Sequence, residues 1–310
     1  SAQPALRVNT GSNNVGIGSG ALSGNTTANN NTAVGYKCLT SNTTASENTA
    51  MGAYTADANT TGTKINAFGY KALTSNTTGI ENTGLGCHTL HDNTTGNYNT
   101  AVGRGALDAN TTGTGNVAVG GLTLAANTTR NYNTSMGYGS LDQNTTASNN
   151  TGIGHAALTS NTTGTQNTAL GASALATSQT ANNNTAVGRS AGGNITTGEQ
   201  NTALGSNALV TNTVGDRSVA IGYQSLYYQN PSSNVDMYNT AVGYNAGAGI
   251  TTGTQNTAIG KGTLESNTTA NDNTAVGNDA LSDNTTGTEN TALGQASLFK
   301  NTTGGQNTAI

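Results

Sequence analysis

The chain has few of the residues that build an ordinary globular core or a charged binding surface. Its 310 residues include no Trp, two Phe, two Pro and two Cys, and charged residues make up only 8%. The formal net charge of −4 provides no basic surface for nucleic acid. No apolar run approaches the roughly 20 residues that span a bilayer. We therefore expect no nucleic-acid partner and no direct membrane insertion of this segment.

Residues that carry chemistry are also scarce. The three histidines are His88, His91 and His155. A metal site needs three or four convergent ligands, and only Asp92 stands beside the first two. Aromatic residues, at 4%, are too few to line a glycosidase groove around paired carboxylates. We predict surface histidines, no catalytic, cofactor-binding or metal residues, no cofactor, and a protein that is not an enzyme.

The two cysteines, Cys38 and Cys87, occupy different positions of a repeat, three copies apart. At strand spacing that separation is about 14 Å, beyond the roughly 7 Å between Cα atoms that a disulfide allows. We predict two free thiols.

What the chain has in abundance is repetition. The unit reads N-T-A-V-G-x-x-A-L-x-x-N-T-T-G-x-x, numbered here from position one, which Asn31 occupies, to position seventeen, which Glu47 occupies. Its position-five glycine recurs every 17 residues, and one step of 21 separates Gly222 from Gly243. These glycines are Gly18, Gly35, Gly52, Gly69, Gly86, Gly103, Gly120, Gly137, Gly154, Gly171, Gly188, Gly205, Gly222, Gly243, Gly260, Gly277 and Gly294. A fixed short period of this kind predicts a solenoid.

The repeat favours strands over helices, because glycine and N-T-T interrupt every helical pattern within about two turns. We predict an all-β parallel β-solenoid in which each 17-residue rung is a short strand, a bend at glycine, a second short strand and a turn at N-T-T-G. Rungs stacked about 4.8 Å apart would form a rod of about 80 Å. Stacked copies would also place each Asn on the next, so that side-chain amides form ladders.

Alternation along N-T-A-V directs Thr and Val to one face and Asn and Ala to the other. We expect the apolar residue of position four and the Leu of position nine to fill the core. Gly192 and Gly247 replace that Leu and predict a locally thin core. The small residues of position three would then form an exposed strip along which copies of the chain associate, and a closed cyclic oligomer would bury it on every copy.

Residues 218–222 (S-V-A-I-G) and 116–120 (N-V-A-V-G) resemble the head repeat of YadA-type trimeric autotransporter adhesins. The recurrent N-T-A-V-G and N-T-T-G also resemble repeats of trimeric bacterial and phage fibres. The likeness covers essentially the whole chain, although the period of 17 is longer than the usual head repeat and Thr usually replaces the first Val. The resemblance implies a left-handed β-roll, a homotrimer and a role in adhesion.

The longer step adds four residues within the irregular loop 227–238, which holds three of the eleven Tyr. Insertions in solenoids become loops on one face, often a binding face. Aromatic side chains dominate binding hot spots, so we predict receptor contacts at Tyr227, Tyr228, Met237 and Tyr238.

We therefore predict a single domain, 1–310, that acts as a structural and adhesive fibre segment. The chain begins without Met and stops inside a repeat, so we expect it to belong to a longer fibre. Its partners would be its own copies and a protein or glycan ligand on a host cell or matrix. Its location would be extracellular, either on a bacterial surface in an outer-membrane-anchored fibre or on a phage virion.

Three questions stay open at this stage. The array could instead be the shaft of a phage tail fibre or tailspike that carries a separate receptor-binding or enzymatic domain. Its regularly spaced Thr residues make an ice-binding solenoid a minor alternative. Each N-T-T is formally a glycosylation sequon, but glycans on every rung would stand only about 5 Å apart, so at most a few could be modified.

Overall fold

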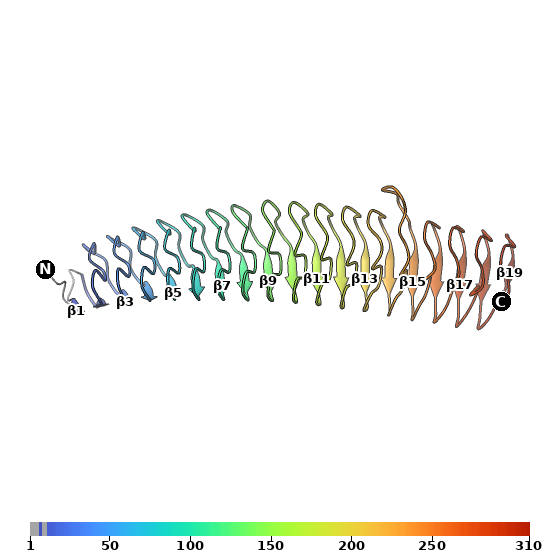
Figure 1. Ribbon diagram of the computed structural model, residues 1–310, viewed down its shortest axis with the longest axis horizontal. Helices are drawn as coiled ribbons and strands as arrows, with labels where there is room; N and C mark the ends of the chain where they lie inside the picture. The colour runs from blue at the N-terminus through green and yellow to red at the C-terminus, as the bar shows by residue number, and fades with distance from the viewer. Residues whose placement is uncertain (1–5, 8–10) are drawn as a thin grey trace. The chain divides into compact units, whose positions relative to one another are not determined.

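The computed structural model describes residues 6–7 and 11–310, with side chains described from residue 11 onward. The chain divides into two units, Ser1–Asn150 and Thr151–Ile310. Within each unit, short strands follow one another side by side, one strand to each turn of the chain (Figure 1). Among the described residues there is no helix, and hence none long and apolar enough to cross a membrane.

The described part of the first unit contains nine strands. They are β1 (Leu6–Arg7), β2 (Val15–Ile17), β3 (Thr32–Val34), β4 (Thr49–Met51), β5 (Asn66–Phe68), β6 (Thr83–Leu85), β7 (Thr100–Val102), β8 (Val117–Val119) and β9 (Thr134–Met136). Strand β1 pairs antiparallel with β2, and β2 to β9 pair in parallel with a uniform register, such as Ala33 opposite Ala50. The predicted 17-residue parallel solenoid is confirmed.

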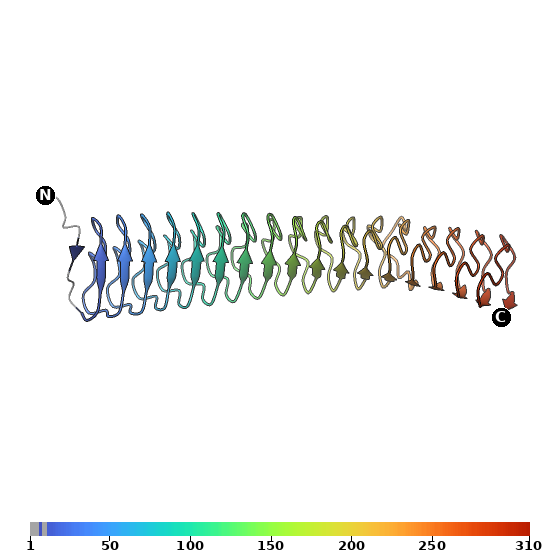
Figure 2. The same ribbon diagram turned by 90° about the horizontal axis from the view of Figure 1, so that it is seen from below.

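The second unit repeats the pattern with ten parallel strands. They are β10 (Thr151–Ile153), β11 (Thr168–Leu170), β12 (Thr185–Val187), β13 (Thr202–Leu204), β14 (Val219–Ile221), β15 (Thr240–Val242), β16 (Thr257–Ile259), β17 (Thr274–Val276), β18 (Thr291–Leu293) and β19 (Thr308–Ala309). The 21-residue step leaves the register intact, because Val219 still pairs with Thr240. Figure 2 shows the same succession of strands and turns from below.

Each rung contains one strand, so the predicted second strand is wrong. The segment around Leu39 is a turn in which Lys37 and Leu39 have φ of 52° and 49°. These left-handed residues curl the chain instead of extending it. Backbone bonds to the next rung nevertheless continue through the turn, as from Leu39 N to Thr55 O at 3.0 Å. The turn therefore contributes to stacking as the strand does.

The bend at position five is confirmed. Gly35 has φ of 140°, and a Cβ added there would lie 2.2 Å from Gly52 O on the next rung. Position five is thus restricted to glycine both by its backbone conformation and by the close approach of the neighbouring rung. The turn at N-T-T-G, in contrast, forms without left-handed backbone at Asn42 or Gly62, since neither has a positive φ.

The alternation along the strand is confirmed, but the predicted core face is wrong. Ala33 at position three is completely buried, whereas Val34 at position four is only half-buried and Met51 is 46% exposed. The interior is filled by Leu39 and its equivalents together with the position-three Ala. A rung only 17 residues around has room for one large side chain, and Leu takes that room. The small-residue strip is therefore internal and unavailable for association.

Two Asn ladders complete the interior. Along position one the side-chain amide Asn99 Nδ2 donates to Asn82 Oδ1 at 3.2 Å, which confirms the predicted ladder. A second ladder runs along position twelve, where Asn59 Nδ2 donates to Asn42 Oδ1 at 3.1 Å and to Gly62 O at 2.9 Å. All four Asn side chains are fully buried and bonded within the described part of the chain. Polar residues at the core are stable here because each satisfies the next.

The core does not become thin where glycine replaces Leu. Gly192 coincides with Ile195 at position twelve, where most other rungs carry Asn, and Ile195 is 1% exposed. A Cβ on Gly192 would lie 3.0 Å from both Ile195 Cδ1 and Leu175 Cδ2, so Ile fills the space that Leu vacates. Gly247 and Ile250 are related in the same way, with Ile filling the space of the missing Leu. The prediction of a locally thin core at Gly192 and Gly247 is therefore wrong.

Candidate functional site

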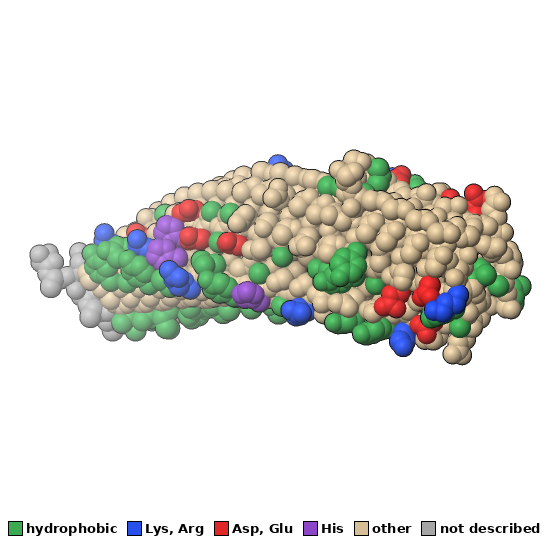
Figure 3. Space-filling view, turned by 45° about the vertical axis from the view of Figure 1, so that its right-hand side comes forward, with side chains coloured by type: hydrophobic (Ala, Val, Ile, Leu, Met, Phe, Trp, Pro, Cys, Tyr) green, Lys and Arg blue, Asp and Glu red, His purple; other side chains and the backbone are tan. Residues whose placement is uncertain are grey.

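An apolar stripe runs along the outer face of the strands. Because position three points inward, the position-four side chains point outward, and those of successive rungs stand about 4.8 Å apart. Apart from the C-terminal Ile310, the most exposed members in the two units are Ile17, Met51, Leu85, Met136, Leu170, Leu204, Ile259 and Leu293. Figure 3 shows hydrophobic side chains gathered along one edge of the face in view. Exposed apolar side chains gathered in this way within each unit make the stripe a candidate interaction site.

A row of aromatic rings follows the turns of the first unit. Tyr36 and Tyr54 meet edge to face with centroids 5.2 Å apart, Tyr54 and Tyr70 at 6.3 Å, and Tyr70 reaches His88 at 5.7 Å. Lys71 Nζ lies 5.5 Å from the Tyr70 centroid. This row was not predicted, although the sequence signals it by an aromatic residue at position six or seven of successive repeats.

A hollow in the second unit lies beside two tyrosines at the start of the loop 227–238. Tyr227 and Tyr228 pack edge to face at 4.7 Å. They line a hollow of about 280 Å³ together with polar side chains, among them Asn245 and Glu265. Asn245 Nδ2 donates to Glu265 Oε1 at 3.0 Å, whereas Asn245 Oδ1 is buried and accepts no hydrogen bond in the described part of the chain. The hollow thus combines aromatic faces with polar groups.

The other two predicted contact residues lie apart from that hollow. Tyr238 is 50% exposed, and Arg217 bonds both its hydroxyl, at 3.0 Å, and the carboxylate of Asp236. Met237 is completely buried and anchors the loop from inside. Of the four predicted residues, the three tyrosines remain available for surface contact.

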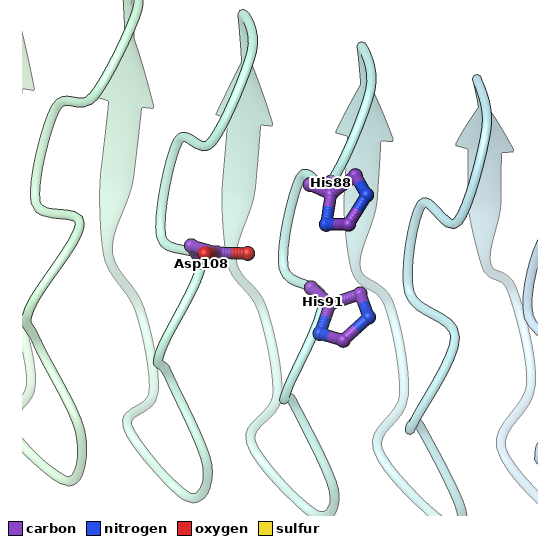
Figure 4. Close-up of side chains that lie close together, drawn as sticks. All are labelled: His88, His91 and Asp108. Atoms are coloured by element: carbon purple, nitrogen blue, oxygen red, sulfur yellow. The ribbon is translucent and has the colours of Figure 1, made fainter.

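Two histidines and one acid converge on neighbouring rungs of the first unit. His88 and His91 have nearly parallel rings with centroids 4.8 Å apart. Asp108 extends toward them from the next rung (Figure 4). One ligand atom from each of the three residues lies within 4.8 Å of the others. The cluster does not stand out in the sequence, where only Asp92 lies beside the two histidines and Asp108 is 17 residues beyond His91.

The cysteines are both free, as predicted. Cys38 is buried, and burial raises the pKa of its thiol to about 12. Cys87 is half-buried and lines a second hollow, of about 220 Å³, with His88, Arg104 and Asp108. The Cys38 thiol therefore has a packing role, whereas Cys87 stands at a surface.

The N-T-T sequons begin with buried residues over most of the array. Asn42, Asn59, Asn76, Asn93 and Asn110 are completely buried, and their amide nitrogens already donate hydrogen bonds along the ladder. In the folded chain these amides are inaccessible to a glycosylating enzyme.

Comparison with known proteins provides no relative from which a role can be transferred. No family model matches the chain, no curated protein matches it, and no solved structure matches it. A function for this chain therefore has to be inferred from its own geometry.

Proposed function

We propose that this chain is a structural and adhesive fibre segment in which three copies pack through the position-four stripe. The observation that best supports this proposal is the stripe itself, which presents one outward-facing apolar side chain per rung, repeated at the strand spacing. A second copy of the chain presents the same spacing, so its side chains match in register over many rungs. The sequence resemblance to trimeric adhesin repeats supplies the number three and the left hand of the coil.

The test is the mass of the purified chain in solution, measured by light scattering. A mass three times 30.8 kDa supports the trimer, and a monomer overturns it. Replacing Leu170 and Ile259 by Glu should give monomers, because each of the two substituted rungs would bury an unpaired charge in the interface with a neighbouring copy. The matched control replaces Thr180 and Thr269, exposed residues outside the stripe, by Glu and should leave the trimer intact. A trimer that survives the stripe substitutions would rule out this interface.

We further propose that adhesion uses the hollow beside Tyr227 and Tyr228, with a glycan as ligand. Two tyrosine faces offer apolar contact to a sugar ring, while Asn245 and Glu265 offer a free acceptor and a carboxylate for hydroxyl groups. A few anchoring side chains of this type supply most of the binding energy at an interface. The location would be extracellular, on a bacterial surface or a phage virion.

Screening the chain on an array of immobilised glycans tests this contact. Binding should fall at least tenfold in Tyr228→Ala and be unchanged in Tyr132→Ala, a control at another exposed tyrosine. Equal binding by both variants would remove the hollow from the adhesive surface without affecting the fibre proposal.

A second candidate function is favoured by one observation. The position-two Thr side chains share the outward face of the strands with position four, so that face carries a Thr row at the strand spacing. Regular Thr arrays on flat solenoid faces can match an ice lattice. A thermal hysteresis assay separates the two proposals: activity in a monomeric chain would favour ice binding, and its absence in a trimer would favour the fibre.

A further inference from the structure

We propose that His88, His91 and Asp108 form a binding site for one divalent transition-metal ion of the zinc class. The site joins two adjacent rungs, because the histidines belong to one and the acid to the next (Figure 4). It is independent of the fibre assignment, since neither the position-four stripe nor the insertion contributes a residue.

The repeat positions explain why the three side chains converge. His91 and Asp108 both occupy position ten, so the stacking of rungs places Asp108 beside His91. The backbone fixes the pair, with Leu90 N donating to Ala106 O and Asp92 N donating to Asp108 O, each at 3.0 Å. The ligands therefore stand on a scaffold that is already ordered.

Asp92 prepares His91 to bind a metal. Its Oδ1 lies 2.7 Å from His91 Nδ1. When His91 donates the Nδ1 proton to this carboxylate, its Nε2 carries the lone pair that a metal requires. A carboxylate behind a ligating histidine is the usual outer partner of zinc sites, where it fixes the tautomer and raises the basicity of the ring.

Asp108 provides an unused buried oxygen. Its Oδ1 is buried and has no hydrogen-bond partner among the residues that the structure describes. A buried carboxylate oxygen without a partner carries a desolvation penalty, which a cation relieves. Burial accordingly raises the pKa of Asp108, while His91 is the largest of the neighbours that lower it.

The net charge around the site suits a cation. The carboxylates of Asp92 and Asp108 face the histidines, and Arg104 is the opposing positive charge from the neighbouring rung. Two acids thus outweigh one base. The adjoining hollow of about 220 Å³ leaves room for water on the open side of the ion.

The donor set selects the metal. Two imidazole nitrogens and one carboxylate oxygen suit zinc and its neighbours rather than calcium or magnesium, which prefer oxygen ligands. Ligands about 2.1 Å from a tetrahedral zinc ion stand roughly 3.4 Å from one another. The ligand atoms all lie within 4.8 Å of one another, so small side-chain rotations close the site around the ion. Three protein ligands leave a fourth position for water.

Calorimetric titration of the chelator-treated full chain with zinc chloride tests the site. The chain should bind one zinc ion per copy, and His91→Ala and Asp108→Asn should each weaken binding at least tenfold. Asp92→Asn should weaken it by about 10- to 100-fold, as expected for an outer carboxylate. The matched control is Asp142→Asn, which changes position ten of another rung without nearby histidines and should bind as the native chain does.

X-ray absorption at the zinc edge provides the second readout. The expected first shell contains nitrogen and oxygen only, with two imidazoles. Circular dichroism of each variant checks that loss of binding is not loss of fold. Absence of saturable binding, or Asp108→Asn binding as tightly as the native chain, would overturn the three-residue site, and a sulfur ligand would show that Cys87 has displaced one of them.

Discussion

Asn93 donates a hydrogen bond from its side-chain amide to Asn76 Oδ1 on the preceding rung, at 2.7 Å, and another to Gly96 O on its own rung, at 3.1 Å. Its own Oδ1 accepts from Asn110 Nδ2 at 2.8 Å. One buried side chain thus connects three rungs and closes a turn. In the first unit this ladder is continuous from Asn25 to Asn144, so removing a member affects the residues on both sides.

Replacing Asn93 by Ala should therefore destabilise the chain by about 2–4 kcal/mol, since it deletes several hydrogen bonds and deprives buried groups of their partners. Chemical denaturation followed by circular dichroism measures the change. Asn301→Ala is the control: it lies at the same repeat position on the last full turn, is only half-buried and has a ladder neighbour on one side. Equal losses from the two variants would contradict a ladder whose strength comes from burial.

Substitutions of the position-five glycine should separate the cost of steric contact with the next rung from the cost of backbone strain. Gly277 has φ of 131°, and a Cβ there would meet Gly294 O at 2.5 Å; Gly294 has φ of 112° but nothing within 4 Å. Gly294→Ala should cost about 1–3 kcal/mol from strain alone. Gly277→Ala should cost clearly more, because the next rung must also shift. Thermal melts of both variants provide the comparison, and a smaller effect at Gly277 would contradict close stacking.

Asp142 gives the stability a defined pH dependence. Burial raises the pKa of this carboxyl above its ordinary value. The folded chain therefore binds more protons than the unfolded chain between the two pKa values, so the contribution of Asp142 to stability falls as pH rises through that window and stays low above it. Asp142→Asn should raise the melting temperature at pH 7, with a smaller gain at pH 3.

The control for that pH series is Asp272→Asn, which alters an exposed carboxyl. It should leave the melting temperature nearly unchanged at both pH values. A loss of stability in Asp142→Asn at pH 7 would contradict the sign derived from burial.

The two thiols should react at different rates. The Cys38 thiol donates to Ala50 O at 3.2 Å inside the core, and burial raises its pKa to about 12, so almost no thiolate forms at neutral pH. Iodoacetamide should alkylate Cys87 in the native chain and leave Cys38 unmodified, as read by mass spectrometry of peptides. Both should react in denaturant, and native alkylation of Cys38 would show that this rung opens.

The period carried most of the fold prediction. It established stacked rungs, their parallel register and the bend at position five, because each follows from repetition and from the needs of glycine. The inward face could not be read in the same way. Val34 is more apolar than Ala33, and a sequence pattern assigns the more apolar residue to the core. The decision depended on volume: Leu39 already fills the rung, so only Ala fits beside it.

The metal cluster shows a different limit. His88 and His91 are visible as neighbours in sequence, but Asp108 becomes a neighbour only when position ten of one rung lies beside position ten of the next. The 17 residues between His91 and Asp108 are one full period, and this spacing could have identified the pair from the sequence. The tyrosine hollow had the same kind of signal, because Tyr227 and Glu265 both occupy position ten, two rungs apart, and Gln224 and Asn245 both occupy position seven.

The uniform register also has a genetic consequence. Because Ala33 pairs with Ala50 as Ala258 pairs with Ala275, a whole repeat can be lost or duplicated and the rungs on either side of the junction still meet as before. Unequal recombination between near-identical coding repeats would change the number of rungs in single steps while preserving the fold. A lineage carrying this gene can therefore change the number of rungs without evolving a new interface between them.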